Sequence, residues 1–303
     1  MKRSAIPSLL ITSLLAIPLA RSASSEEKSE QGPRLRTKPF TLVVMKDQFK
    51  GAPHWEVNAV LQAAAGELVQ YFPDFELPPV KVGRGAPRIY WRHGMHEGKP
   101  YDLILISAAA RDWCQYLYQL SHELCHKLQR ADVKGAHEAA WFGETLSELA
   151  SMFVVRAASG SWKKRPPYGN AQYYAGALAN YADTITRRYR LPEGITLARH
   201  YRENKGELLR TSCNREINGC VAAALLPLFI EAPHRWESIQ WLFIRREEIP
   251  TGRTLTFEQV LAEWKYHVPG RHKAFTEKLS AQFGIDIRGS KHLAAPNRRE
   301  VSK

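Results

Sequence analysis

The chain has 303 residues, of which 44% are hydrophobic, an ample apolar content for the core of one large domain or of a two-lobed one. The formal net charge of +13 is compatible with anionic partners. However, the basic residues are scattered and form no recognised nucleic-acid motif, which disfavours nucleic acid as the partner. The sequence also has no glycine-rich phosphate-binding loop and no internal repeat.

The first residues have the pattern of an export signal. Met1-Lys2-Arg3 is basic, the stretch 5–20 is apolar, and small residues follow it. The apolar stretch is shorter than the roughly 18 residues of a spanning helix. We therefore predict a signal peptide at 1–22, a polar, flexible lead-in at 23–38, and export to the periplasm or the medium. No transmembrane span is expected after signal removal, and a retained N-terminal anchor is the alternative.

The next segment alternates between strand and helix patterns. A helix is expected from Trp55 to Phe72, because its apolar residues recur at helical spacing and Pro73 follows. His93 and His96 are expected to be surface histidines in a glycine-containing loop. Strands are predicted at Thr41–Met45, Val80–Val82, Arg88–Trp91 and Tyr101–Ser107.

Tyr101–Ser107 has the clearest strand pattern of the four. It is followed by a helix, predicted from Asp112 to Gln129, that carries an HExxH motif. The motif histidines, His122 and His126, are four residues apart, so both imidazoles lie on one face and can reach a single zinc ion. Glu123 is next to the first histidine, where it can reach the open coordination position. With 11 histidines in the chain, a chance HExxH match is expected only about 0.03 times.

A second apolar helix, predicted at Trp141–Val155, supplies two carboxylates. Glu144 and Glu148 are four residues apart on one face, where like charges repel. A zinc ion held by Glu144, with Glu148 accepting the distal N–H of a ligating histidine, would supply the missing positive charge.

The two motifs together resemble the gluzincin metallopeptidases, the thermolysin-like group, over about Tyr101 to Ser151. The resemblance implies that His122, His126 and Glu144 bind one Zn²⁺ per chain. It also implies that Glu123 is the general base and that Glu148 supports a histidine from behind. The implied fold is α+β and zincin-like, with a small N-terminal sheet packed on the HExxH helix and a mostly helical C-terminal part. One strand edge would pair with an extended peptide substrate.

Two details differ from the family pattern. Gly143 precedes the third ligand, where thermolysin itself often has Asn, and the GxMEN stretch of the large gluzincin aminopeptidases is missing.

The alternative is a metzincin-like HExxHxxGxxH/D pattern, in which Asp132 would be the third ligand. Gln129 occupies the glycine position that this pattern requires, so Glu144 is preferred.

The remainder of the chain is predicted to be helical at Ala171–Tyr189, Gly219–Ile230 and Phe257–Phe283. We expect a metallopeptidase domain at 39–286, with lobes at 39–130 and 131–286, and a basic disordered tail at 287–303. Cys213 and Cys220 could form a disulfide. Cys114 and Cys125 lie too far apart along one helix to bridge each other.

The predicted function is a zinc-dependent peptidase that hydrolyses peptide bonds with a water activated by Glu123 at the zinc. The alternatives are a catalytically silent zinc-binding zincin that acts as a binding module, and a basic exported nucleic-acid or cell-surface binder. The partner is a peptide or protein substrate, and the oligomeric state is open. The oxyanion-stabilising residue also stays open among His137, Tyr173, Tyr174, His200 and Tyr201.

Overall fold

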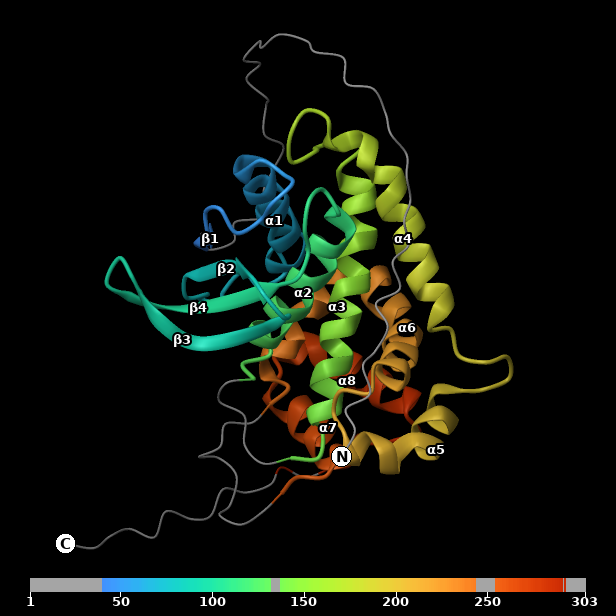
Figure 1. The fold of residues 1–303 in the computed structure, drawn as a ribbon. Helices are drawn as coiled ribbons and strands as arrows, with labels where there is room; N and C mark the ends of the chain where they lie inside the picture. Colours follow the sequence, from blue (N-terminus) through green and yellow to red (C-terminus); the bar gives the residue numbers. More distant parts are fainter. Residues whose placement is uncertain (1–39, 132–136, 244–253, 291, 293–303) are drawn as a thin grey trace, which may run out of the picture. The chain divides into compact units, whose positions relative to one another are not determined.

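The structure is a computed structural model, and it describes residues 40–131, 137–243, 254–290 and 292. These residues form an α+β fold with a small mixed sheet and mostly helices (Figure 1). The α+β class is therefore as predicted. The predicted signal peptide at 1–22, the lead-in at 23–38 and Asp132 lie outside the described residues.

The sheet has four strands in the order β1-β2-β4-β3. β1 pairs with β2 and β2 with β4 in parallel, whereas β3 and β4 form an antiparallel hairpin. Each predicted strand is present, and β3 is longer than predicted. The strand bounds are β1 Leu42–Val44, β2 Val80–Arg84, β3 Arg88–His96 and β4 Lys99–Ile106.

The prediction that His93 and His96 lie in a loop is wrong, because both belong to β3. The glycine that suggested a loop has another role. A Cβ at Gly94 would lie 2.8 Å from Cε1 of Tyr101, so glycine allows this ring to lie against the strand. The register shifts between Tyr90 and Gly94, which identifies the irregularity as a bulge inside a continuous strand.

One face of the sheet is covered by α1 (His54–Val69) and α2 (Trp113–Leu128). Val82 and Ile104 are buried and adjacent in register, while Lys81 and Leu105 on the opposite face are half-exposed. This alternation is the period-two pattern of a sheet with one buried face. The HExxH helix therefore packs directly on the sheet, as predicted.

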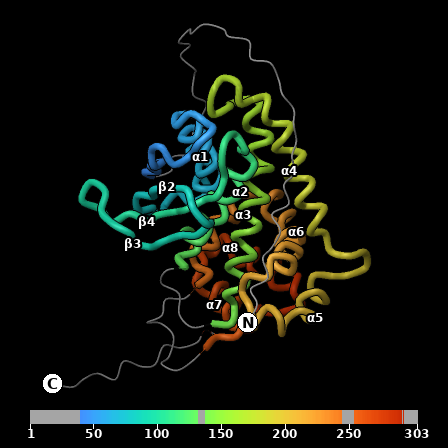
Figure 2. Tube along the Cα trace, in the orientation of Figure 1, coloured from blue at the N-terminus to red at the C-terminus, as the bar shows by residue number. Residues whose placement is uncertain are grey.

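The long helix α3 (Ala140–Ser161) contacts α1, α2, α4 and α6, so it lies at the centre of the fold (Figure 2). Its first turn is anchored by Trp141 and Phe142, which pack against Phe257 and Phe283. The remaining helices are η1 Ala171–Tyr174, α4 Ala175–Arg188, α5 Leu197–Arg210, α6 Arg215–Glu231, η2 Pro233–Trp241, α7 Phe257–His267 and α8 Gly270–Gln282.

The structure differs from the sequence prediction at α5, at η2 and at the division between α7 and α8. The single helix predicted at Phe257–Phe283 is divided into α7 and α8, because Pro269 has no backbone N–H to continue the ladder. α5 was not predicted at all, although Thr196 accepts a hydrogen bond from the Arg199 N–H as a normal N-cap.

The packed part of the chain extends beyond the predicted boundary at 286. Ile287 is buried in the core, and His292 contacts Glu263 of α7. Both predicted lobes belong to one compact unit.

The four cysteines are free thiols, so Cys213 and Cys220 form no disulfide in this structure.

Within the described residues, no single helix is long and apolar enough to cross a membrane. α6 and η2 together pass this test by length and composition, but the chain bends by 118° between them.

A buried ion pair connects the sheet to the HExxH helix. Lys127 Nζ lies 2.6 Å from Asp102 Oδ2, and both side chains are almost inaccessible to solvent. The other carboxylate oxygen, Oδ1, accepts a hydrogen bond from the Arg92 N–H at 2.8 Å, within the bulge of β3. Arg92 has a φ of 47°, a left-handed conformation that this hydrogen bond supports. The Asp102 carboxylate therefore holds both the edge strand β3 and Lys127, the residue after His126.

We predict that Lys127→Met lowers the free energy of unfolding by about 3–5 kcal/mol, because it leaves the Asp102 charge buried and unpaired. Urea denaturation followed by circular dichroism measures the change. The control is Arg199→Met, which removes a half-exposed i,i+4 pair with Glu203 and should change stability by less than about 1 kcal/mol. Equal effects of the two substitutions would show that the buried pair has no special role.

Candidate metal site

α2 presents the two motif histidines on one face, as their spacing predicts. The ring centroids of His122 and His126 are 5.1 Å apart, and both side chains are partly exposed. The helix ends at Leu128, directly after the motif, and Arg130 follows with a φ of 54°. The chain therefore leaves the helical conformation soon after the motif.

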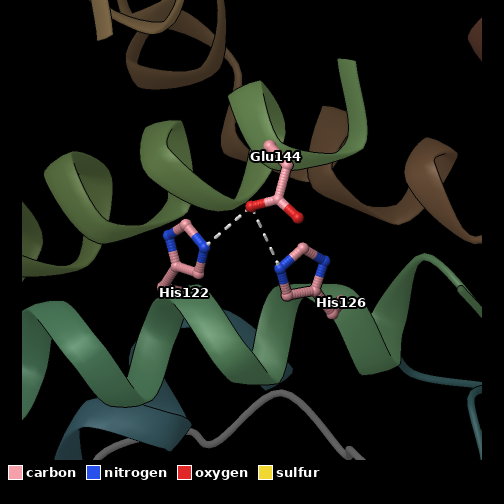
Figure 3. Close-up of side chains that lie close together, drawn as sticks. All are labelled: His122, His126 and Glu144. Atoms are coloured by element: carbon pink, nitrogen blue, oxygen red, sulfur yellow. Dashed lines mark ion pairs between the residues drawn. The ribbon is translucent and has the colours of Figure 1, made fainter. Parts of the chain in front are cut away.

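α3 brings Glu144 to the two histidines (Figure 3). Glu144 Oε2 lies 3.4 Å from His122 Nε2 and 3.6 Å from His126 Nε2. One nitrogen from each histidine and one oxygen of Glu144 all lie within 4.8 Å of one another. The three residues predicted as ligands therefore converge on one point.

These distances fit a zinc ion. Ligand bonds of about 2.0–2.2 Å in a tetrahedron place neighbouring ligand atoms about 3.3–3.6 Å apart. Both measured nitrogen–oxygen separations fall in this interval. Two imidazoles and one carboxylate are also the donor set of catalytic zinc sites that keep a fourth position open. The side chains present can therefore hold Zn²⁺ with little movement.

Two further side chains orient the histidines from behind. His122 Nδ1 lies 3.5 Å from Glu148 Oε2, and the Tyr118 hydroxyl donates a hydrogen bond to Glu148 Oε1. His126 Nδ1 lies 3.3 Å from Ser147 Oγ. Each imidazole therefore has its Nε2 aimed at Glu144 and its Nδ1 held by a polar partner, the arrangement expected around histidine ligands.

The pKa shifts in the cluster show that its carboxylates favour a positive charge between them. Burial lowers the pKa of His122, but hydrogen bonds with Glu144 and Glu148 outweigh this and raise it to about 10. Burial also raises the pKa of Glu144, yet hydrogen bonds from His122 and His126 lower it below its ordinary value. The pKa of Glu148 is lowered by His122 in the same way, against the effect of burial. A protonated His122 and a metal cation would satisfy the same carboxylates.

Glu123 is nearly buried, and burial raises its pKa. The two motif histidines and Arg88, at the start of β3, act in the opposite direction. A carboxylate with a raised pKa is a better proton acceptor near neutral pH, which suits a general base. The structure thus gives Glu123 an environment different from that of Glu144.

The packing of α2 against α3 is tight at one point. Gln129 Nε2 donates to the Gly143 carbonyl at 3.1 Å and to Ser147 Oγ at 3.2 Å. A Cβ at Gly143 would lie 3.0 Å from Gln129 Oε1 and 3.1 Å from Phe243 Cζ. Glycine before Glu144, the predicted third ligand, is therefore explained by this close helix contact.

Sequence reasoning missed Tyr118, Ser147 and Gln129. Helical spacing could have indicated the first two, because Tyr118 is four residues before His122 and Ser147 is three residues after Glu144. In the sequence, Gln129 is notable only because it occupies the glycine position of the metzincin pattern. Its role depends on the helix crossing, which spacing along one helix does not define.

The five candidate oxyanion donors have different surroundings. Tyr201 is buried with its ring stacked on Trp141, so it belongs to the aromatic core. Tyr173 is 78% exposed on η1, whereas burial raises the pKa of the neighbouring Tyr174. Burial lowers the pKa of His200 on α5. His137 stacks on Phe243 with ring centroids 4.6 Å apart, and its Nδ1 accepts a hydrogen bond from the Ala139 N–H.

We predict that Gly143→Ala weakens zinc binding about tenfold, the lower end of the effect of groups that orient metal ligands. It should also destabilise the fold by about 1–3 kcal/mol, as overpacking does. Chelator competition and urea denaturation measure the two effects. The control is Gly160→Ala in the same helix, where no atom lies within 4 Å of the added Cβ. This control should leave zinc binding unchanged, and equal effects of the two substitutions would contradict the proposed close contact.

Comparison with known proteins gave no match, either among family models or among curated proteins and solved structures. The functional conclusion therefore depends on the geometry of this site.

Proposed function

We propose that the chain is a zinc-dependent peptidase of the gluzincin type, with a zincin-like α+β fold. The observation that carries the proposal is the convergence of His122, His126 and Glu144 at zinc-ligand spacing. Glu123 interacts electrostatically with all three. The buried Glu148 behind His122 supports it, because a purely structural helix contact has no need of a second carboxylate. Export to the periplasm or the medium belongs to the same proposal.

A bound Zn²⁺ would lower the pKa of a water molecule and polarise the scissile carbonyl. Glu123 accepts the proton of that water and later delivers it to the leaving amine. Its near-complete burial favours this role, since burial raises the pKa of the carboxylate. Glu148 and Ser147 hold the two imidazoles in the required orientation.

The substrate backbone is proposed to pair with β3. This strand is an edge of the sheet, so one side of its backbone is available to another chain. β3 also contacts α2, since the Lys127 ammonium lies over the Trp91 ring at 4.8 Å. β1 is the other edge, but its partner helix is α1 and not the HExxH helix. β3 is therefore the edge beside the metal site.

We predict that Glu123→Gln lowers kcat/KM for peptide hydrolysis about 10²–10⁴-fold while the protein still binds zinc, because only the base is lost. An unbiased peptide-library digest followed by mass spectrometry measures the activity, and metal analysis measures the zinc content. The control is Glu76→Gln on the exposed surface, which should cleave like wild type.

Two outcomes of this experiment would reject the peptidase. One is a zinc-loaded wild type that cleaves no peptide, which would instead support a silent zinc-binding module. The other is a Glu123→Gln variant that cleaves as fast as wild type. Salt-sensitive binding to anionic partners that survives chelation, without any bound zinc, would support the basic exported binder.

We predict that Glu148→Gln weakens zinc binding about 10–100-fold without unfolding the protein. The amide keeps the shape of the side chain but removes the charge that stabilises the His122 N–H. Competition with a chromophoric chelator measures the affinity. Glu193→Gln, at an exposed position, is the matched control. Unchanged zinc affinity in Glu148→Gln would mean that Glu148 does not support the metal site.

A further inference from the structure

A second cluster of histidine and carboxylate side chains lies at the end of α7. Glu263 and His267 are one turn apart on this helix, and His292 arrives from the segment after α8. His292 Nδ1 lies 2.7 Å from Glu263 Oε2, and His267 Nε2 lies 3.5 Å from the same oxygen. One ligand atom from each residue lies within 4.8 Å of the other two.

The cluster is built into the packed structure. The Glu263 side chain is only 1% exposed, so its charge is shielded from water. His267 Nε2 is also buried and has no hydrogen-bond partner in the described part of the chain. A buried imidazole nitrogen without a hydrogen-bond partner is costly, and a metal ion at the centre of the cluster would give His267 Nε2 a ligand bond.

Contacts outside the cluster hold His292 in place. Its ring stacks on Tyr266, with centroids 3.9 Å apart and planes 3° apart. Lys265 Nζ donates hydrogen bonds to the carbonyls of Ile287 and Arg288, at 3.2 and 2.9 Å. The segment is therefore attached to α7 just before it reaches the cluster.

We propose that Glu263, His267 and His292 bind a divalent transition-metal ion, with Zn²⁺ as the first candidate, at a second site separate from the HExxH cluster. Two imidazoles and one carboxylate are borderline ligands that select zinc and its neighbours over calcium or magnesium. The 3.5 Å separation matches the spacing of about 3.3–3.6 Å between zinc ligands. The 2.7 Å separation is a hydrogen-bond distance, so metal binding displaces a proton there and moves His292 outward by less than about 1 Å.

The role of this ion is to fasten the segment after α8 to α7. The site is independent of the proposed peptidase function, because none of its ligands belongs to α2 or α3. The sequence predicts one zinc ion per chain, and the second site would raise this number to two.

Metal stoichiometry of the full-length protein tests the proposal. The full chain and its variants are dialysed against buffered Zn²⁺, and bound metal is measured by mass spectrometry. Wild type should bind two ions, and both His122→Ala/His126→Ala and His267→Ala/His292→Ala should bind one. The matched control is His93→Ala/His96→Ala, a pair of β3 histidines outside both clusters, which should bind two.

A second readout does not depend on activity. With Co²⁺ in place of zinc, the His122→Ala/His126→Ala variant should show the visible d–d bands of a low-coordinate His/carboxylate site. These bands should disappear when His267→Ala/His292→Ala is added. Should that double substitution perturb folding by circular dichroism, His292→Ala alone suffices, because its side chain is the most exposed of the three.

The two sites can fail separately. A wild type that binds one ion, lost only in His122→Ala/His126→Ala, overturns the second site and leaves the peptidase proposal intact. One ion lost only in His267→Ala/His292→Ala supports the second site and overturns the peptidase proposal. Two ions that persist in His267→Ala/His292→Ala would also reject the second site.

Discussion

The close contact between α2 and α3 is the constraint on which the candidate metal site depends. His122 and His126 lie on one helix, and their spacing is fixed by helical geometry alone. Glu144 lies on the other helix, so its distance to the histidines depends on how closely the two backbones approach. Gln129 sets that approach through its hydrogen bonds to Gly143 and Ser147, and the lack of a side chain at Gly143 permits it.

Buried or partly buried carboxylates pair with side chains of α2 at two places. At the candidate metal site, Glu144 and Glu148 both face His122, and their hydrogen bonds raise the pKa of this histidine. One position after His126, Lys127 neutralises the buried Asp102 of β4. Asp102 also holds the bulge of β3. The sheet edge that is proposed to receive substrate and the helix that carries the motif are thus connected through one buried charge.

Local periodicity explains why much of this arrangement was accessible from the sequence. The i,i+4 spacing of the histidines and of Glu144 and Glu148 directly predicts shared helix faces, and the alternating apolar residues predict the strands. The bulge at Gly94 and the contact at Gly143 depend on side chains distant in sequence, Tyr101 in one case and Gln129 in the other. A glycine has the same appearance in a sequence whether it starts a loop or permits a close contact. For this reason the sequence predicts a loop at His93 and His96, and it gives no reason for the glycine at position 143.

The two histidine–carboxylate clusters differ in how their side chains are positioned before a metal binds. All three residues of the HExxH cluster lie on long helices that the core packs together, so the ligands are positioned before binding. In the second cluster, Glu263 and His267 are fixed on α7, but His292 lies beyond the last helix. His292 Nδ1 already lies at hydrogen-bond distance from Glu263 Oε2, so part of the binding free energy at the second cluster must offset the loss of this contact. From this difference we infer tighter binding at the HExxH cluster.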